Sequence, residues 1–310
     1  MCPHKYNLSK DKPDDNDIYV SINLKVHEHS EPVMVVDHRP TCPPVYNQGA
    51  LGSCTSHALS CIFYHNMVRF NSSEIFHPSC MFLYYNTRLL KNSVGEDEGG
   101  SLRDALKALY VYGICPENVW EYNPICYKTR PPQTAYDFGQ KHNSISYFRV
   151  PQVLSQLCQC LMDGYLFAFG LSIYSHFEND ANHHQGLISL PSASDVYMGG
   201  HAACAIGFDN YRQVFIVRNS WGDEWGDHGY FYLPYAYMTN SDLVYDLWTF
   251  RNRLEITQLL VTELNAPVGD GAVFEITTVG EEAEKNHKQE TTPHPDTSHH
   301  RSRSKCCILA

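Results

Sequence analysis

A cysteine, a histidine and an asparagine stand in contexts that could support nucleophilic catalysis. Cys54 closes a turn-forming stretch that begins with Gln48, six residues earlier, and contains two glycines and a serine. Segment 55–70 carries apolar residues at the spacing of one helix face, so Cys54 is expected to open a helix. At that position the unpaired backbone N–H groups and the helix dipole favour a thiolate. The pattern therefore predicts an activated nucleophile at Cys54.

A cysteine nucleophile also needs a base, a group that orients the base, and donors for the developing oxyanion. His201 follows Gly199 and Gly200, whose lack of side chains lets a substrate backbone come close, and precedes an apolar strand. Asn219 ends another short strand, and its amide can accept a hydrogen bond from one imidazole nitrogen. Trp221 could cover that bond from water. These residues are the candidates for the remaining catalytic roles.

In these motifs the chain resembles the papain-like cysteine peptidases, in a branch similar to bacterial and large-DNA-virus members. Four motifs match in order, namely Gln48-Gly49-x-x-Gly52-Ser53-Cys54, Gly99-Gly100 before a helix, Gly200-His201-Ala202, and Asn219-Ser220-Trp221-Gly222-x-x-Trp225-Gly226-x-x-Gly229-Tyr230. The resemblance covers about residues 36–250. It implies an α+β fold of two lobes, a helical left lobe and an antiparallel, barrel-like right lobe, with the active site in the cleft between them.

The resemblance assigns a role to each candidate. Cys54 would be the nucleophile and His201 the base and then the acid. Asn219 would orient His201, and the Gln48 amide would join the Cys54 backbone N–H in an oxyanion hole. The implied reaction is hydrolysis of a peptide bond through a thioester acyl-enzyme. No cofactor or metal is implied.

The same resemblance suggests where a protein or peptide substrate binds. Gly99 and Gly100 would pair with the substrate backbone as an added strand. The other substrate-binding candidates are Ser101, Leu102, Gly199, Gly200, Ala202 and Trp221. A metal site at His183-His184 is a weaker interpretation than a polar loop.

The chain departs from the family pattern at the nucleophile and at its N-terminus. Leu51 stands where secreted members carry a disulfide cysteine, which suits an intracellular enzyme. Thr55 and His57 replace the usual residues after the nucleophile. Residues 1–35 are too few for the long helical propeptide of lysosomal relatives. We expect this extension, a possible short propeptide and zymogen device, to lie over the cleft or pack against a lobe.

The organisation of the chain also predicts an α+β fold, because a helix-rich half precedes a strand-rich half. Helices are expected over 55–70, 78–90 and 101–112, and strands over 166–173, 202–208, 214–218 and 229–233. We place a peptidase domain at 36–268, with a left lobe at about 48–140 and a right lobe at about 141–255. Residues 269–310 lose their apolar content and are expected to be disordered.

The composition of the chain limits which partners and which cellular compartment we expect for it. The formal charge of −11 over 310 residues argues against nucleic acid as a partner. The sequence has no apolar run long enough to span a membrane and no apolar segment typical of a signal peptide. The twelve cysteines match neither a zinc site nor a disulfide framework. We therefore expect a cytoplasmic or virion-associated protein of undetermined oligomeric state.

The last residues match a lipidation signal. Cys307-Ile308-Leu309-Ala310 fits the C-a-a-X pattern for farnesylation, and Cys306 could be palmitoylated. Three basic residues just before them would strengthen attachment to a cytosol-facing membrane. The alternative is a chance match in a disordered tail.

Two other functions use the same scaffold. One is a catalytically silent peptide-binding module, and the other is an acyltransferase that passes the acyl group to an amine. The first is disfavoured because all the catalytic positions are filled. The second uses the same residues and stays open.

Overall fold

The computed structural model describes residues 4–20, 33–178 and 185–252 of the chain. Its helices are α1 (Cys54–Arg69), α2 (Cys80–Leu90), α3 (Leu102–Tyr112), α4 (Gln133–Gly139), α5 (Leu154–Met162) and α7 (Tyr235–Met238). Short 3₁₀ helices occur at Arg39–Thr41, Pro124–Cys126 and Ser175–Glu178. Its strands are β1 (Val35–Asp37), β2 (Ile145–Arg149), β3 (Phe167–Tyr174), β4 (Tyr197–Asp209), β5 (Val214–Arg218), β6 (Tyr230–Pro234) and β7 (Val244–Asn252).

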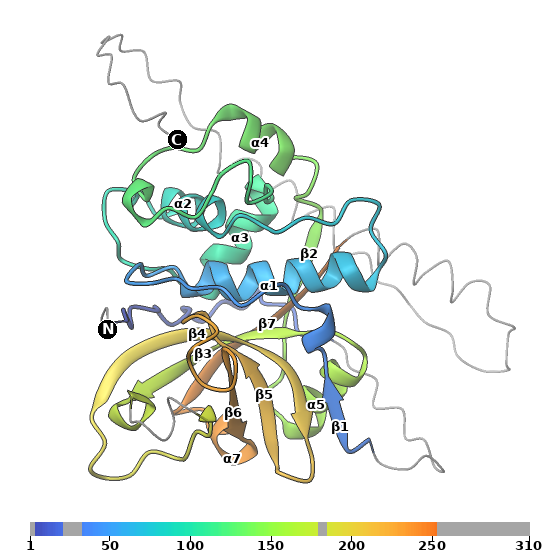
Figure 1. Ribbon diagram of the computed structural model, residues 1–310, viewed down its shortest axis with the longest axis vertical. Helices are drawn as coiled ribbons and strands as arrows, with labels where there is room; N and C mark the ends of the chain where they lie inside the picture. The colour runs from blue at the N-terminus through green and yellow to red at the C-terminus, as the bar shows by residue number, and fades with distance from the viewer. Residues whose placement is uncertain (1–3, 21–32, 179–184, 253–310) are drawn as a thin grey trace, which may run out of the picture. The chain divides into compact units, whose positions relative to one another are not determined.

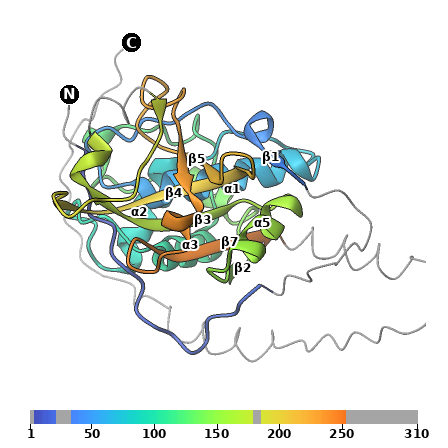
Figure 2. The ribbon, with the colours of Figure 1, turned by 90° about the horizontal axis from the view of Figure 1, so that it is seen from below.

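The fold has a helical lobe and a sheet lobe. Helices α2, α3 and α4 lie above α1 in Figure 1, and strands β1, β3, β4, β5 and β6 lie below it. Figure 2 views the molecule from the side of the sheet, with β3 and β4 in front of α1. This is the two-lobed α+β fold expected from the sequence. The lobe boundaries near residues 140 and 255 stay predictions, and the expected disorder at 269–310, His183-His184, Cys306 and Cys307 lie outside the described residues.

Local signals in the sequence account for the three main helices. Helix α1 begins at Cys54, as expected, and is buried along most of its length between the two lobes. The Ser101 hydroxyl caps α3 by accepting from the Asp104 backbone N–H at 3.1 Å. Gly113 ends α3 with a φ of +68°, a conformation that strains other residues. Helices α4, α5 and α7 were not predicted, and in α5 the helical spacing of Leu154, Leu157 and Leu161 extends over only nine residues.

The sheet is antiparallel throughout, with the strand order β2-β7-β3-β4-β5-β6 and β1 paired to β4. Strands β1, β2 and β7 were not expected. Strand β4 begins at Tyr197 rather than at residue 202, because residues up to His201 already pair with β3. His201 stands opposite Leu171 in that register. The pairing fixes the histidine in the middle of a long strand.

The largest hydrophobic cluster joins the two lobes. It includes Leu59 and Ile62 of α1, Leu106 of α3, and Phe169 and Phe215 of the sheet, all essentially without exposure. Burying such a side chain stabilises the fold by about 1.5–3 kcal/mol. Continuous packing through α1 therefore holds the two sides of the cleft in a fixed relation.

Within the described residues the cysteines contribute to packing rather than to cross-links. Nine of them lie in the described residues, and all nine are free thiols there. Six of these are buried, which fits the behaviour of cysteine as a small hydrophobic residue. Among the described residues, no helix is long and apolar enough to cross a membrane.

Candidate active site

Cys54 lies at the first position of α1 and is 1% exposed. Burial raises the pKa of its thiol to about 11, although the backbone N–H groups of Ala202, Thr55 and Cys54 itself act in the opposite direction. The influence of Ala202 places the sulfur beside β4, next to His201. The helix start and the histidine strand therefore meet at this thiol.

His201 and Asn219 form the hydrogen bond expected of a base and its orienting group. The distance from His201 Nε2 to Asn219 Oδ1 is 2.9 Å. The same oxygen accepts from the Ser220 backbone N–H at 2.9 Å, which fixes the direction of the amide. His201 Nε2 must then carry the proton, since a carbonyl oxygen only accepts, and Nδ1 keeps its lone pair. Within the described part of the chain, buried Nδ1 has no hydrogen-bond partner.

Burial also controls the charge of His201. Desolvation lowers its pKa to about 3, with the Asn219 hydrogen bond acting against it. The Trp221 ring lies 4.8 Å from the His201 ring and is itself 5% exposed, so it shields the pair from water. With the thiol pKa raised and the imidazole pKa lowered, both groups are neutral at pH 7 in this conformation.

Gln48 is held between the loop that precedes Cys54 and the loop that follows Asn219. Its Nε2 donates to the Leu51 carbonyl at 2.9 Å, and its Oε1 accepts from the Ser220 hydroxyl at 2.5 Å. The Gln48 backbone N–H also donates to the Ser220 carbonyl at 2.8 Å. The side chain is fully buried. Of the two amide hydrogens on Nε2, one is used in the bond to Leu51, and the second is the one that an oxyanion could accept.

Residues 4–20, called the strap below, cross this site. The Leu8 N–H donates to the Gly200 carbonyl at 3.1 Å, and the Gly200 N–H donates to the Tyr6 carbonyl at 3.2 Å. A Cβ added to Gly99 would come within 2.6 Å of the Asn7 carbonyl oxygen, so the strap backbone needs a glycine there. Strap residues thus contact both Gly99, just before α3, and Gly200 of β4.

Side chains of the strap fill the space around the site. His4 stacks on Trp221 with ring centroids 4.4 Å apart. Leu8 is only 9% exposed, and a Cβ on Gly170 would meet its Cδ2 at 2.8 Å and the Tyr245 ring at 2.4 Å. Leu8 therefore occupies an apolar pocket on the sheet lobe, and His4 covers the tryptophan over the histidine.

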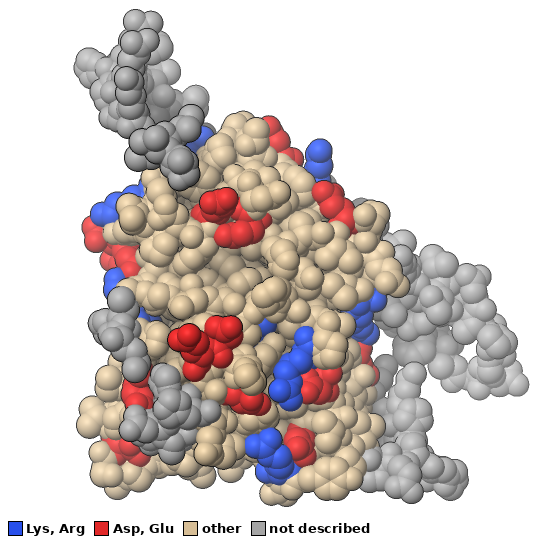
Figure 3. Space-filling view, in the orientation of Figure 1, with Lys and Arg blue, Asp and Glu red and all other residues tan. Residues whose placement is uncertain are grey.

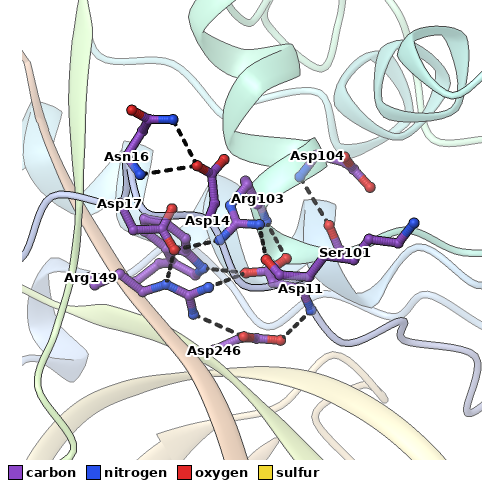
Figure 4. A network of polar contacts seen from close by, with 11 residues as sticks. Asp11, Asp14, Asn16, Asp17, Ser101, Arg103, Asp104, Arg149 and Asp246 are labelled. Carbon is purple, nitrogen blue, oxygen red and sulfur yellow. Dashed lines mark hydrogen bonds and ion pairs between the residues drawn. The ribbon is translucent and has the colours of Figure 1, made fainter.

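A network of charges fastens the far end of the strap (Figure 4). Arg149 forms ion pairs with Asp246 at 2.8 Å, with Asp17 at 2.9 Å and with Asp11 at 3.3 Å. Arg103 also pairs with Asp17. Because Asp11 and Asp17 belong to the strap and the other groups to the body, we call these five residues the latch.

Burial and the neighbouring Asp246 raise the pKa of Asp11. The Trp248 indole N–H donates to Asp11 Oδ2 at 2.8 Å, which supports the carboxylate from the sheet. Removing one partner from such a buried network costs more than an exposed pair would. The latch therefore orders the strap strongly.

The remaining residues predicted to bind substrate lie in different surroundings, some at the strap and some in the core. Gly199 contacts the strap closely, since a Cβ there would meet the Tyr6 carbonyl oxygen at 2.2 Å. Gly100 is packed against Thr87, and Ser101 caps α3. Leu102 is fully buried in the core, so its part in substrate binding stays a prediction. In the described residues no cluster of side chains is suited to a metal ion.

Two residues near the site were not predicted from the sequence. Asp97 lies beside the nucleophile loop, where its carboxylate accepts from the Gly52 N–H at 2.9 Å. Tyr245 lies against Leu8 from β7. Neither belongs to a recognisable motif, and both reach the site through long-range contacts.

The chain is similar to known proteins over most of its length. The profile of the family described as "Papain family cysteine protease" matches residues 34–244. An uncharacterized peptidase C1-like protein of Acanthamoeba polyphaga mimivirus is 30% identical over 282 residues, covering 84% of this chain and 90% of the relative. Xylellain, a cysteine protease from Xylella fastidiosa, has 33% identity and a TM-score of 0.74, covering 80% of this chain and 96% of its own.

A more distant structure supports the fold alone. Digestive procathepsin L 3 of Tenebrio molitor larval midgut has 17% identity and a TM-score of 0.57. The match covers 77% of this chain and 75% of that one. The likeness therefore extends to the two-lobed architecture well beyond the range of clear sequence similarity.

Proposed function

The chain belongs to the papain family of cysteine proteases, and on that premise we propose that Cys54, His201, Asn219 and Gln48 carry out its hydrolysis of peptide bonds. The observation that supports this most is the 2.9 Å bond from His201 Nε2 to Asn219 Oδ1, on the strand that adjoins Cys54. It leaves Nδ1 as the nitrogen that can exchange a proton with the thiol.

In the proposed reaction, the Cys54 thiol gives its proton to His201 Nδ1 and the sulfur attacks the substrate carbonyl carbon. The oxyanion that forms accepts from the free amide hydrogen of Gln48 and from the Cys54 backbone N–H. His201 then gives the proton to the leaving amine, and a thioester remains. Water attacks the thioester carbonyl carbon while His201 Nδ1 takes a proton from the water. The carbon–sulfur bond then breaks, the acid leaves, and His201 returns the proton to the Cys54 sulfur.

We further propose that the strap holds the enzyme in a closed, inactive state. Its backbone pairs with Gly200, which would otherwise be open to a substrate backbone. By adding to the burial of the site, the strap would also favour the neutral forms of Cys54 and His201, the same direction in which burial shifts their pKa values. Once the strap leaves, solvent can stabilise the thiolate–imidazolium pair that attack requires. The strap would thus inhibit both by filling the cleft and by desolvating the pair.

Gln48→Glu tests the oxyanion assignment. Glutamate keeps the oxygen that accepts from Ser220 but removes the amide donor and brings a negative charge toward the oxyanion. We expect kcat on a fluorogenic peptide to fall about 10²–10³-fold with little change in KM, because the donor acts mainly in the transition state. Gln133→Ala, at an exposed helical glutamine, should leave kcat unchanged. An unaltered kcat in a folded Gln48→Glu protein would remove Gln48 from the mechanism.

A further inference from the structure

Asp97 lies on the cleft wall with its carboxylate held in one orientation by the body of the enzyme. Its Oδ1 accepts from the Gly52 backbone N–H at 2.9 Å and from the hydroxyl of Tyr84 on α2. Gly52 is two residues before Cys54, so this bond ties the nucleophile loop to the segment that leads to Gly99. The two donors fix Oδ1 and thereby decide where Oδ2 points.

Oδ2 is taken by the strap. It forms an ion pair with the ammonium group of Lys5, which is 47% exposed while the Asp97 side chain is 9% exposed. Asn7, two residues further along the strap, donates from Nδ2 to the Asp97 backbone oxygen at 3.1 Å. Asn7 also fills the space between Gly52 and Gly99, because a Cβ on either glycine would lie within 3 Å of its side chain. The strap therefore presents a cation and an amide to Asp97.

Asp97 is ionised at neutral pH. Burial acts to raise its pKa, but the hydrogen bonds from Lys5, Tyr84 and Gly52 together lower it. Leaving a partly buried carboxylate without a cation is costly. When the strap leaves the cleft, Oδ2 loses Lys5 and needs a replacement of the same charge.

The surroundings favour a positive substrate group as well. Glu96 and Glu98, on either side of Asp97, are exposed and carry the same charge. Acidic side chains are spread over the face shown in Figure 3, in keeping with the formal charge of −11. Such a field draws basic peptides toward the cleft before any specific contact forms.

Resting on the function proposed above, we propose that Asp97 is a specificity-determining residue that selects lysine or arginine in the substrate. The selected residue is the one whose carbonyl group Cys54 attacks. Its side chain starts beside Cys54 and lies against Gly52 and Gly99, in the place now taken by Asn7. From there its ammonium or guanidinium group replaces that of Lys5 on Oδ2.

Covalent probes test this in the full-length chain. Two peptidyl ketone probes that alkylate a reactive cysteine are compared, one with lysine and one with norleucine next to the reactive carbon. The two side chains have similar alkyl length, so they differ chiefly in charge. Because the strap must open before either probe enters, its opening equilibrium cancels in the ratio of their labelling rates at Cys54. The ratio therefore measures how strongly the open cleft prefers the lysine side chain over the norleucine side chain.

We expect the lysine probe to label Cys54 about tenfold to a hundredfold faster, as a charge-assisted hydrogen bond allows. Asp97→Asn keeps Oδ1 for Gly52 and Tyr84 but removes the charge, and should bring the ratio close to one. Glu98→Gln, which removes the neighbouring exposed charge, should keep the ratio of the unaltered chain.

The outcomes separate the two proposals. Equal labelling rates in the unaltered chain, or an unchanged ratio in Asp97→Asn, would overturn the selection by Asp97 and leave the catalytic proposal standing. Failure of both probes to label Cys54 in every variant would overturn both.

Discussion

Replacing His201 with alanine is expected to lower kcat/KM for peptide hydrolysis about 10⁴-fold or more. The His201 imidazole, held by Asn219 beside the start of α1, is the group assigned to move the Cys54 proton, and its loss leaves the thiol with an ordinary or raised pKa. The measurement is the rate of cleavage of a fluorogenic peptide by equal amounts of folded protein. His77→Ala, at an exposed histidine stacked on Tyr64, should keep full activity.

The labelling rate of Cys54 gives this prediction a second readout that loss of structure would not imitate. With His201 present, the thiolate–imidazolium pair forms in the open state, so the rate should change little across neutral pH. In His201→Ala the rate should rise about tenfold for each pH unit, because only the ionised thiol reacts. Equal pH profiles in the two proteins would show that His201 does not activate the thiol.

Leu8→Asp is expected to activate the enzyme about tenfold to a hundredfold. It removes the apolar anchor of the strap, worth about 1.5–3 kcal/mol, and would bury a charge in the pocket formed by Gly170 and Tyr245. Each 1.4 kcal/mol shifts the closed–open equilibrium about tenfold. The body of the protease is untouched, so the gain should appear in both peptide hydrolysis and Cys54 labelling.

Ile18→Asp is the matched control for the strap. It makes the same kind of change in the same segment, but the Ile18 side chain is 58% exposed and has no pocket to leave. It should leave the rates close to those of the unaltered chain. If Leu8→Asp and Ile18→Asp behave alike, the strap does not close the cleft through Leu8.

Local signals made part of the structure predictable from the sequence. The apolar spacing after Cys54 and the cap at Ser101 located α1 and α3 to within a residue or two. The β-branched and aromatic runs located β3, β5 and β6 in the same way. The order of the motifs predicted that His201 and Asn219 pair, and in the structure His201 Nε2 lies 2.9 Å from Asn219 Oδ1.

Contacts between distant parts of the chain were beyond such signals. The Asp11 N–H bonds to Asp246 across 235 residues, and no periodic pattern links two such positions. The sequence left open whether residues 1–35 cover the cleft, because the strap is held by scattered single contacts rather than by a helix or strand of its own. Asp97 was missed for a similar reason, since its importance comes from Gly52, Tyr84 and Lys5 around it.

Mass spectrometry of the full-length chain after reaction with an epoxide cysteine trap tests the central claim most directly. We predict a single adduct on Cys54, loss of peptide hydrolysis in step with the labelling, and no adduct at this position in Cys54→Ala, which should also be inactive. Labelling spread over other cysteines while Cys54 stays unmodified, or continued hydrolysis by Cys54→Ala, would contradict the account.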